Sequence, residues 1–191
     1  VPLVILGVIL STLHQSSLGS LFLIVPSKLS QLWYTPMLPV MFFLSAIAAG
    51  PAMVIIESNL SCKAFGRGLE SDLLAGLGKA SSVALFLYLF VKVADLLVRG
   101  AWIRLLTPTM SSGFFWAEIV LGVLLPAALL SQQSVREDPK ALFRAALLVI
   151  GGIVLNRFNV SMIGMFAYTG VTYVPSIGEI LVSLSLVVGG V

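Results

Sequence analysis

The sequence predicts an all-α fold: a polytopic transmembrane bundle of about six helical segments, with the first and last truncated and several of the others near the roughly 20 residues that a spanning helix needs. Hydrophobic residues make up 59% of the chain and charged residues only 10%, whereas soluble domains carry roughly 25% charged residues. The mean hydropathy is +1.09. The net charge of +3 suits basic loops on one side of a membrane and requires no nucleic-acid partner. We therefore expect one transmembrane domain over residues 1–191, in contact with lipid and without a soluble domain.

The first apolar run begins at Val1 and meets a polar run, His14-Gln15-Ser16-Ser17-Leu18-Gly19-Ser20. Polar groups without partners are costly in hydrocarbon but are solvated at the membrane surface. We therefore expect the first helix to end near His14. Residues 1–13 and 177–191 are each too short to cross a core of about 30 Å, so further helix is expected beyond both ends.

A second helix is predicted over residues 37–58, because Pro39 suits a first helical turn. Trp33 and Tyr34 precede it and are typical of headgroup depth. A polar loop over residues 59–71 should follow, and then a third helix over 72–98.

The second half of the chain repeats this alternation of apolar and polar stretches. We expect helices over residues 114–130 and 141–165, separated by the polar stretch 131–140. A short loop over 168–175 and a last helix from Ser176 should complete the chain.

The basic residues of the loops predict an orientation. Five flank one side of the membrane, Lys63, Arg67, Arg136, Lys140 and Arg144, and three flank the other, Lys28, Arg99 and Arg104. Because cytoplasmic loops carry an excess of Lys and Arg, we expect the 59–71 and 131–140 loops in the cytoplasm. His14, Trp33 and Arg104 should then lie outside, in the periplasm of a bacterium.

Charged side chains inside the later helices should lie at one depth, near the outer side. Helix counting places five there, Lys92, Asp95, Glu118, Arg157 and Glu179. Charges in membrane segments usually face a bundle interior, paired or beside water, although they can also snorkel to headgroups or form structural ion pairs. We expect Glu118 and Arg157 to pair directly or through water, with Asp95 nearby, in a charged layer that serves as a proton pathway.

Two single residues limit the chemistry. His14 is the only histidine and Cys62 the only cysteine. A bis-histidine haem, an internal disulfide and a cysteine-held iron–sulfur cluster are therefore not expected within this chain alone. His14 could still exchange protons near neutral pH, although a histidine at a helix end is often without chemistry. Glu57, at the cytoplasmic end of its helix, is either a helix-end residue or a point of proton entry.

Several motifs together resemble the NrfD/polysulfide-reductase membrane-anchor family, in particular its hydrogenase-2-type branch. They are the run from His14 to Ser20, Leu32-Trp33, Met37-Leu38-Pro39, Val54 to Leu60 around Glu57, Phe115-Trp116-Ala117-Glu118, Arg157, and Tyr173-Val174-Pro175-Ser176 through Glu179. The run from His14 followed by the Glu57 helix is the most specific of them. The resemblance covers essentially the whole chain.

The resemblance implies a function and a location. Members exchange electrons and protons between a quinone, menaquinone or ubiquinone, and a periplasmic iron–sulfur subunit that serves a hydrogenase or related oxidoreductase. They lie in the inner membrane of bacteria or archaea and carry no haem or metal of their own. The chain would be the C-terminal half of a subunit with roughly ten helices. His14 is then expected in or beside a quinone pocket, hydrogen-bonded to a quinone carbonyl directly or through one water, with Gln15, Ser16 and Ser17 forming its polar wall.

Two alternatives stay open. A secondary transporter would also carry charges within its helices, but its site should lie near the midplane, within internal repeats, and the sequence shows no such repeat. A purely structural anchor would retain assembly and lose nothing when His14 is replaced.

Overall fold

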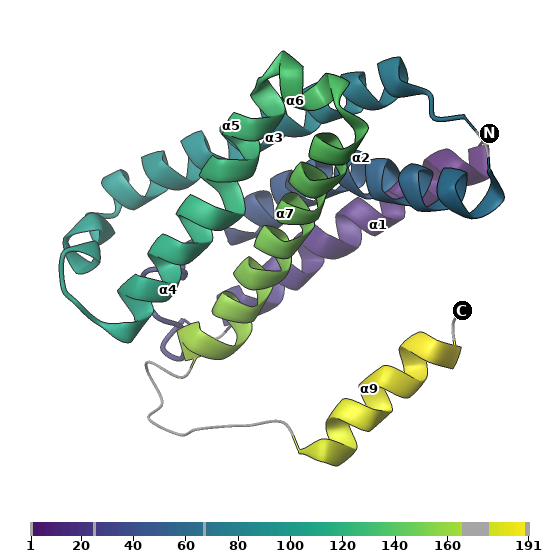
Figure 1. Cartoon of the computed structure of the whole chain (residues 1–191). Coiled ribbons are helices and arrows are strands. Elements are labelled where there is room, and N and C mark those ends of the chain that lie inside the picture. The colour runs from purple at the N-terminus through teal and green to yellow at the C-terminus, as the bar shows by residue number, and fades with distance from the viewer. Residues whose placement is uncertain (1, 25, 67, 166–175, 190–191) are drawn as a thin grey trace.

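The computed structural model describes residues 2–24, 26–66, 68–165 and 176–189, and its regular structure within these ranges consists of helices without a strand (Figure 1). Five helical spans in them are long and apolar enough to cross a membrane. The predicted all-α polytopic bundle is confirmed. The predicted 168–175 loop lies outside the described residues.

The helical elements follow one another in this order: α1 (Pro2–Leu21), η1 (Phe22–Ile24), α2 (Leu38–Phe65), α3 (Ser71–Val98), η2 (Ala101–Leu105), α4 (Met110–Ile119), η3 (Val120–Leu124), α5 (Leu125–Ser131), α6 (Gln133–Glu137), α7 (Pro139–Phe158), η4 (Asn159–Ile163) and α9 (Ile177–Gly189). The segments η3 and η4 are π-helical. One continuous span therefore runs from Met110 to Ser131 and another from Pro139 to Ile163.

The first predicted helix boundary is wrong, because α1 passes through His14 and ends at Leu21. Its hydroxyl groups donate back to carbonyls one turn earlier: Thr12 to Val8 at 2.8 Å and Ser17 to Leu13 at 3.1 Å. Bonds of this kind satisfy Ser and Thr inside a helix without water. These hydroxyl groups therefore do not require the membrane surface.

The second helix also runs further than predicted, to Phe65 instead of residue 58. Asn59 stays within it because its Nδ2 donates to the carbonyl of Ile55 at 3.0 Å. The helix ends at Gly66, whose φ of +63° is left-handed and whose N–H donates to the carbonyl of Cys62. Glycine adopts this conformation without a steric penalty.

The three later spans begin within a few residues of their predicted starts. The span from Met110 starts earlier than residue 114, because Thr109 and Ser112 exchange side-chain and backbone hydrogen bonds in a capping box. The α7 helix begins at Pro139, after Asp138, which accepts a hydrogen bond from the Lys140 N–H at 3.0 Å. Both starts are local N-terminal caps that the hydropathy of the run does not report.

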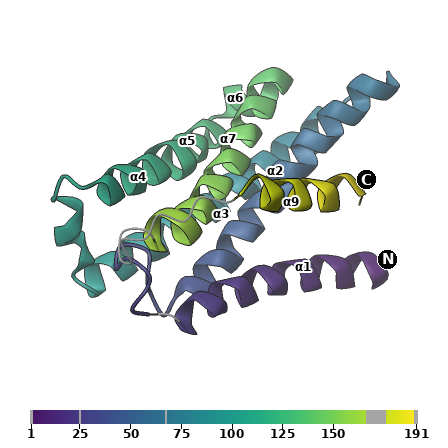
Figure 2. The same cartoon turned by 90° about the horizontal axis from the view of Figure 1, so that it is seen from below.

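Helix α2 is central to the bundle and packs against α1, α3 and α7, and Figure 1 shows α9 apart from them. Figure 2 shows α1 and the α4–α5 span on opposite sides of the bundle. Two crossings depend on glycine. A Cβ added at Gly19 would lie 2.8 Å from the Cα of Pro39, and one added at Gly152 would lie 2.3 Å from the backbone of Gly122. Glycine at these places lets the helix backbones touch.

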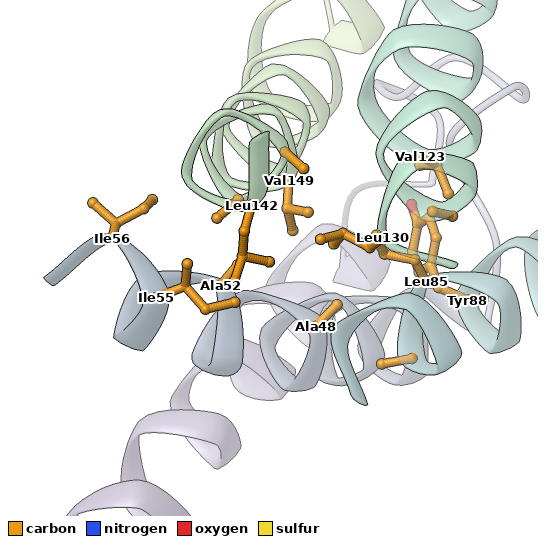
Figure 3. Close-up of a cluster of buried hydrophobic side chains, with 14 of the residues drawn as sticks. Ala48, Ala52, Ile55, Ile56, Leu85, Tyr88, Val123, Leu130, Leu142 and Val149 are labelled. Atoms are coloured by element: carbon orange, nitrogen blue, oxygen red, sulfur yellow. The ribbon is translucent and has the colours of Figure 1, made fainter. Parts of the chain in front are cut away.

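One buried cluster, the apolar layer, joins α2, α3, α5 and α7. It is built around Ala48, Ala52, Leu85, Leu130 and Val149 (Figure 3). A second cluster contains Leu29, Trp33, Phe42, Phe115 and Val160 and lies where α2 begins and α3 ends.

The loops lie at the two ends of the bundle, in the two groups that the sequence predicts. Nη1 of Arg99, after α3, donates to the carbonyl of Gln31 at 2.9 Å, which joins the 26–37 and 99–109 segments at one end. At the other end α6 packs against α3, so the segments 59–71 and 131–140 share a side. Which end faces the cytoplasm stays a prediction.

Candidate functional site

A carboxylate lies at the centre of the buried polar groups. Glu118 on α4 is 0% exposed. Its Oε1 accepts from Lys92 Nζ, with which it forms an ion pair, and from Asn156 Nδ2 at 2.8 Å. Its Oε2 accepts from Trp33 Nε1 at 2.9 Å and from Asn159 Nδ2 at 3.0 Å. We call Glu118 and these four donors the Glu118 hub.

The hub joins the 26–37 segment, α3, α4 and the end of α7 through one side chain. A carboxylate has about four positions for accepted hydrogen bonds, and in Glu118 all of them have donors. An added proton would therefore displace a donor. This geometry suits a fixed anion that holds helices together.

The cation of the hub has aromatic neighbours. Lys92 is buried on α3, and its Nζ donates to the Tyr88 hydroxyl at 3.2 Å. The same atom lies 4.9 Å from the ring centroid of Phe115 and 5.4 Å from that of Tyr88. The ring faces add to the attraction that Glu118 supplies, which makes Lys92 a compensated charge.

Glu118 does not pair directly with Arg157, since Lys92 takes that place, and a link through water stays a prediction. Arg157 Nη1 donates to Asn156 Oδ1 at 2.8 Å, and Asn156 in turn bonds Glu118. Consecutive residues of a helix point about 100° apart, so Asn156 faces Glu118 while Arg157 faces α2. There Nη2 donates to Ser45 Oγ at 2.7 Å, and the guanidinium lies 3.5 Å from the Phe42 ring centroid.

Asp95 lies nearer the end of the bundle. Its Oδ2 pairs with Arg99 at 2.7 Å, and its Oδ1 accepts from the Thr35 hydroxyl at 2.6 Å. A cavity of about 10 Å³ between this pair and the hub is lined by Thr35, Tyr88, Lys92 and Asp95, among others. That volume suits one water molecule. Asp95 and Arg157 are therefore both near the Glu118 hub, as expected for a charged layer.

The side chains from His14 to Ser17 do not form one polar wall, because the helix distributes them around its axis. His14 and Ser17 are exposed, and Ser17 bonds its own helix. Gln15 is half-buried and lines a separate cavity between α1, α2 and α7.

Two other predicted charges lie apart from the hub. Glu57 is exposed on α2, in the half away from Trp33. Glu179 lies in the first turn of α9, where its Oε2 accepts from the Ser176 N–H at 2.8 Å and Ser176 Oγ accepts from the Glu179 N–H at 3.3 Å. This is a helix cap, so the charged layer within the bundle consists of Lys92, Asp95, Glu118 and Arg157.

Sequence reasoning missed the neutral members of the hub. Trp33 is 2% exposed and faces the protein interior, because its N–H has the Glu118 carboxylate as acceptor. The sequence does contain a signal for two of them, Asn156 and Asn159, since polar amides inside an apolar helix require hydrogen-bond partners. The Oδ1 of Asn159 is buried without a partner within the described ranges. Those ranges contain no group of three His, Cys, Asp or Glu that could hold a metal.

Comparison with known proteins identifies the family. A family model described as "Polysulphide reductase, NrfD" matches residues 1–168. The chain belongs to this family. The predicted resemblance is thereby confirmed. Family membership and the five candidate spans together indicate a multi-pass integral membrane protein.

Three relatives extend the comparison. The chain is 43% identical over 169 residues to a protein of Nitratidesulfovibrio vulgaris (strain Hildenborough), covering 84% of this chain and 43% of the relative. It is 31% identical over 188 residues to the probable Ni/Fe-hydrogenase 2 b-type cytochrome subunit of Escherichia coli (strain K12), covering 97% and 48%. It is 29% identical over 172 residues to the menaquinone reductase integral membrane subunit of N. vulgaris, covering 80% and 40%.

The chain thus spans less than half the length of each of these relatives. No solved structure matches it significantly.

Proposed function

We propose that this chain forms part of the membrane subunit of a quinone-linked respiratory oxidoreductase. In this function the subunit exchanges electrons and protons between the quinone pool and a periplasmic iron–sulfur subunit, which passes electrons to or from a catalytic subunit of hydrogenase type. The complex would lie in the inner membrane of a bacterium or archaeon. Similarity to a hydrogenase 2 subunit over 97% of the chain and to a menaquinone reductase subunit supports the proposal.

The observation on which the proposal depends is the gathering of charged side chains at one end of the bundle. Quinol oxidation releases two protons with two electrons, and quinone reduction takes up the same number. A site for this exchange requires polar groups that lead from the membrane face into the hydrocarbon region. Asp95, the water-sized cavity and Lys92 form such a series.

The residue roles in this proposal differ. His14 accepts or releases a quinone proton, because histidine is the side chain that exchanges protons near neutral pH. Asp95 and Arg157 belong to the proton pathway, and Glu57 is a candidate for its entry at the opposite end. Glu179, in the first turn of α9, is also proposed for the proton pathway. We propose no haem and no metal for this chain, although one relative is named a b-type cytochrome subunit.

A structural anchor is the second candidate, and the Glu118 hub favours it. A carboxylate with four donors is arranged to hold helices and not to release a proton. The two candidates predict different quinone-linked turnover when a titratable group outside the hub, such as His14, is replaced.

The test replaces His14 with alanine in the full-length subunit within its complex. As a general base, His14 contributes about 10²–10⁴-fold to rate, so quinone-linked turnover should fall by that factor. Electron transfer from the catalytic subunit to an artificial acceptor should continue. Ser20→Ala, an exposed change on the same helix, should leave both rates unchanged.

Two results would count against the proposal in different ways. Wild-type turnover of His14→Ala between about pH 6 and pH 8 would show that His14 is only an interfacial residue. Absence of quinone-linked turnover from the wild-type complex would favour the structural anchor.

A further inference from the structure

A surface cavity of about 310 Å³ lies between α3 and α6, at the end of the bundle that carries the 59–71 and 131–140 segments. It shares no residue with the Glu118 hub. Small residues of α3 leave the space, and charged and polar side chains surround it. The lining residues are Ala75, Gly76 and Lys79 of α3 and Gln133, Arg136 and Glu137 of α6.

Arg136 is held in this cavity with one edge of its guanidinium free. Its Nη1 donates to the carbonyl of Leu130 at 3.0 Å and to that of Ser131 at 2.8 Å, at the end of α5. Its stem lies over Gly78, where an added Cβ would be 3.6 Å from both Cγ and Cδ. Among the described residues, the Nε–H and the two Nη2–H groups have no acceptor. This edge is the planar fork that binds two oxygens of a phosphate or carboxylate.

Two further charges line the cavity without pairing. Within the described ranges, the Lys79 side chain has no hydrogen bond and no ion pair. Glu137 Oε1 accepts from Gln133 Nε2 at 2.6 Å, whereas its Oε2 has no donor in the same part of the chain. The cavity therefore presents two cations and one anion, each with binding capacity left. A ligand that fits carries an anionic group and, beside it, a cationic one.

The depth of the cavity indicates where such a ligand comes from. The α6 residues Gln133 and Glu137 are exposed, and polar groups of this kind are solvated at the membrane surface and not in hydrocarbon. Since α6 packs against α3 (Figure 1), the cavity lies at headgroup depth.

An apolar track leads from the cavity along α3. Val83, Phe86 and Phe90 follow Lys79 at i+4, i+7 and i+11, which places them on its face of the helix. Their side chains are 61%, 44% and 71% exposed. Acyl chains can cover such a track, which a soluble phosphate ester would leave bare.

We propose that this cavity binds the headgroup of an amine-bearing phospholipid, of the phosphatidylethanolamine class. The phosphate lies between Lys79 and the Nε/Nη2 edge of Arg136, and the ammonium group lies at Glu137. Basic pockets between membrane helices bind lipid headgroups in this way. Phosphatidylglycerol supplies no cation for Glu137, and the quaternary amine of phosphatidylcholine has no N–H to donate. The site lies apart from the proposed redox exchange and does not depend on it.

Two single variants separate the phosphate end of the site from the amine end. Lys79→Met removes a phosphate ligand and breaks no bond between described residues. Glu137→Gln removes the negative charge at the amine with little change in shape. Lys140→Met and Glu70→Gln are the matched controls, because both residues are exposed at the same end of the bundle and do not line the cavity. Arg136 is left in place, since its bonds hold the end of α5.

The measurement is labelling of the full-length subunit, in its complex, by phosphatidylethanolamine with a photoreactive group near the headgroup. Labels are expected on α3 or α6 beside the cavity. Unlabelled phosphatidylethanolamine should compete about tenfold better than phosphatidylglycerol or phosphatidylcholine with the same acyl chains, as expected for one charge-assisted hydrogen bond.

The variants should change this competition in different ways. Lys79→Met should weaken all three lipids about tenfold, because all three carry the phosphate. Glu137→Gln should weaken phosphatidylethanolamine by a similar factor and strengthen phosphatidylglycerol, which removes the preference. Both controls should match the wild type. Unfolding of Lys79→Met in lipid-free detergent should also match the wild type, so a loss of labelling would not reflect misfolding.

Four results would overturn the inference. Labelling that Lys79→Met leaves unchanged would exclude the phosphate site. Equal competition by the three lipids, or a preference that Glu137→Gln retains, would exclude recognition of the amine. Competition by soluble glycerophosphoethanolamine as strong as that of the lipid would make this a site for a soluble ester. Absence of label from α3 and α6 of the wild type would mean that protein, and not lipid, covers the cavity and its track.

Discussion

The Glu118 hub and the apolar layer lie in the same bundle and share α3 and α7, yet they hold the helices together by different forces. In the hub, α3, α4 and the end of α7 meet through an ion pair and directed amide and indole hydrogen bonds. In the apolar layer most contacts are aliphatic, and the polar links are hydroxyls that donate to carbonyls, Ser81 to Ala48 and Ser82 to Ala127, both at 2.9 Å.

This difference shows which part of the bundle determines how its helices pair with one another. Lipid tails are as apolar as leucine, so aliphatic contacts between membrane helices depend on close fit and carry little preference for a partner. A buried charge has a strong preference, because leaving it unpaired is costly. We infer that the apolar layer sets how closely the helices approach, and that the hub sets their rotation and depth.

The largest effect is expected from breaking the hub on one side. Lys92→Met leaves Glu118 buried without its cation, and loss of one partner of a buried pair costs about 3–5 kcal/mol. The free energy of unfolding, measured by detergent titration, should fall by that amount. Lys79→Met, an exposed change on the same helix, should have almost no effect.

A double variant sharpens this prediction. Lys92→Met combined with Glu118→Gln removes both charges, so most of the stability should return. A double variant as unstable as Lys92→Met alone would show that shape, and not uncompensated charge, causes the loss.

A smaller effect is expected in the apolar layer at the crossing of Gly152 and Gly122. A methyl group at Gly152 would lie 2.3 Å from backbone atoms, so the helices must separate. Overpacking of this kind costs about 1–3 kcal/mol, which Gly152→Ala should show as a lowered melting temperature. Gly151→Ala, where the added carbon meets nothing within 4 Å, should match the wild type. Equal stability of the two variants would mean that the crossing is not close-packed.

The same contrast explains what the sequence could predict. Long apolar runs predicted the spans, because in lipid the helix satisfies its backbone groups whatever lies beside it. The run around His14 misled the prediction of α1, because backbone-bonded hydroxyls replace the water that a polar run seems to require. The charge of Glu118 was enough to predict that this residue faces the bundle interior. That prediction needs only the depth of the residue in its helix and the free-energy cost of an unpaired charge in lipid.

The partner of Glu118 could not be predicted in this way. Lys92 and Arg157 were expected at similar depth, and choosing between them requires the rotation of α3 and α7 about their axes. Rotation follows from packing at places such as Gly122 and Gly152, which hydropathy does not report. The burial of Trp33 has the same origin, because its position depends on an acceptor from α4.

The smallest effect is expected at the end of the bundle, where Asp95 and Arg99 form an ion pair that is partly open to solvent, with side chains 10% and 22% exposed. Pairs near solvent contribute about 0–1 kcal/mol and weaken with salt, whereas the buried Lys92–Glu118 pair should not respond to salt. Arg99→Gln also loses the hydrogen bonds to the Gln31 and Tyr34 carbonyls, so the ion-pair part of its cost, about 1 kcal/mol at low ionic strength, is the part that salt should change, with Arg104→Gln as the exposed control. The cost should shrink as salt is raised from about 0.01 M to about 1 M, where the Debye length falls from about 30 Å to about 3 Å. Under the same change the cost of Lys92→Met should stay constant.

If Arg99→Gln proved as costly as Lys92→Met and equally insensitive to salt, the end of the bundle would belong to the hub, and the distinction between a fixed interior charge and a solvated outer pair would be lost.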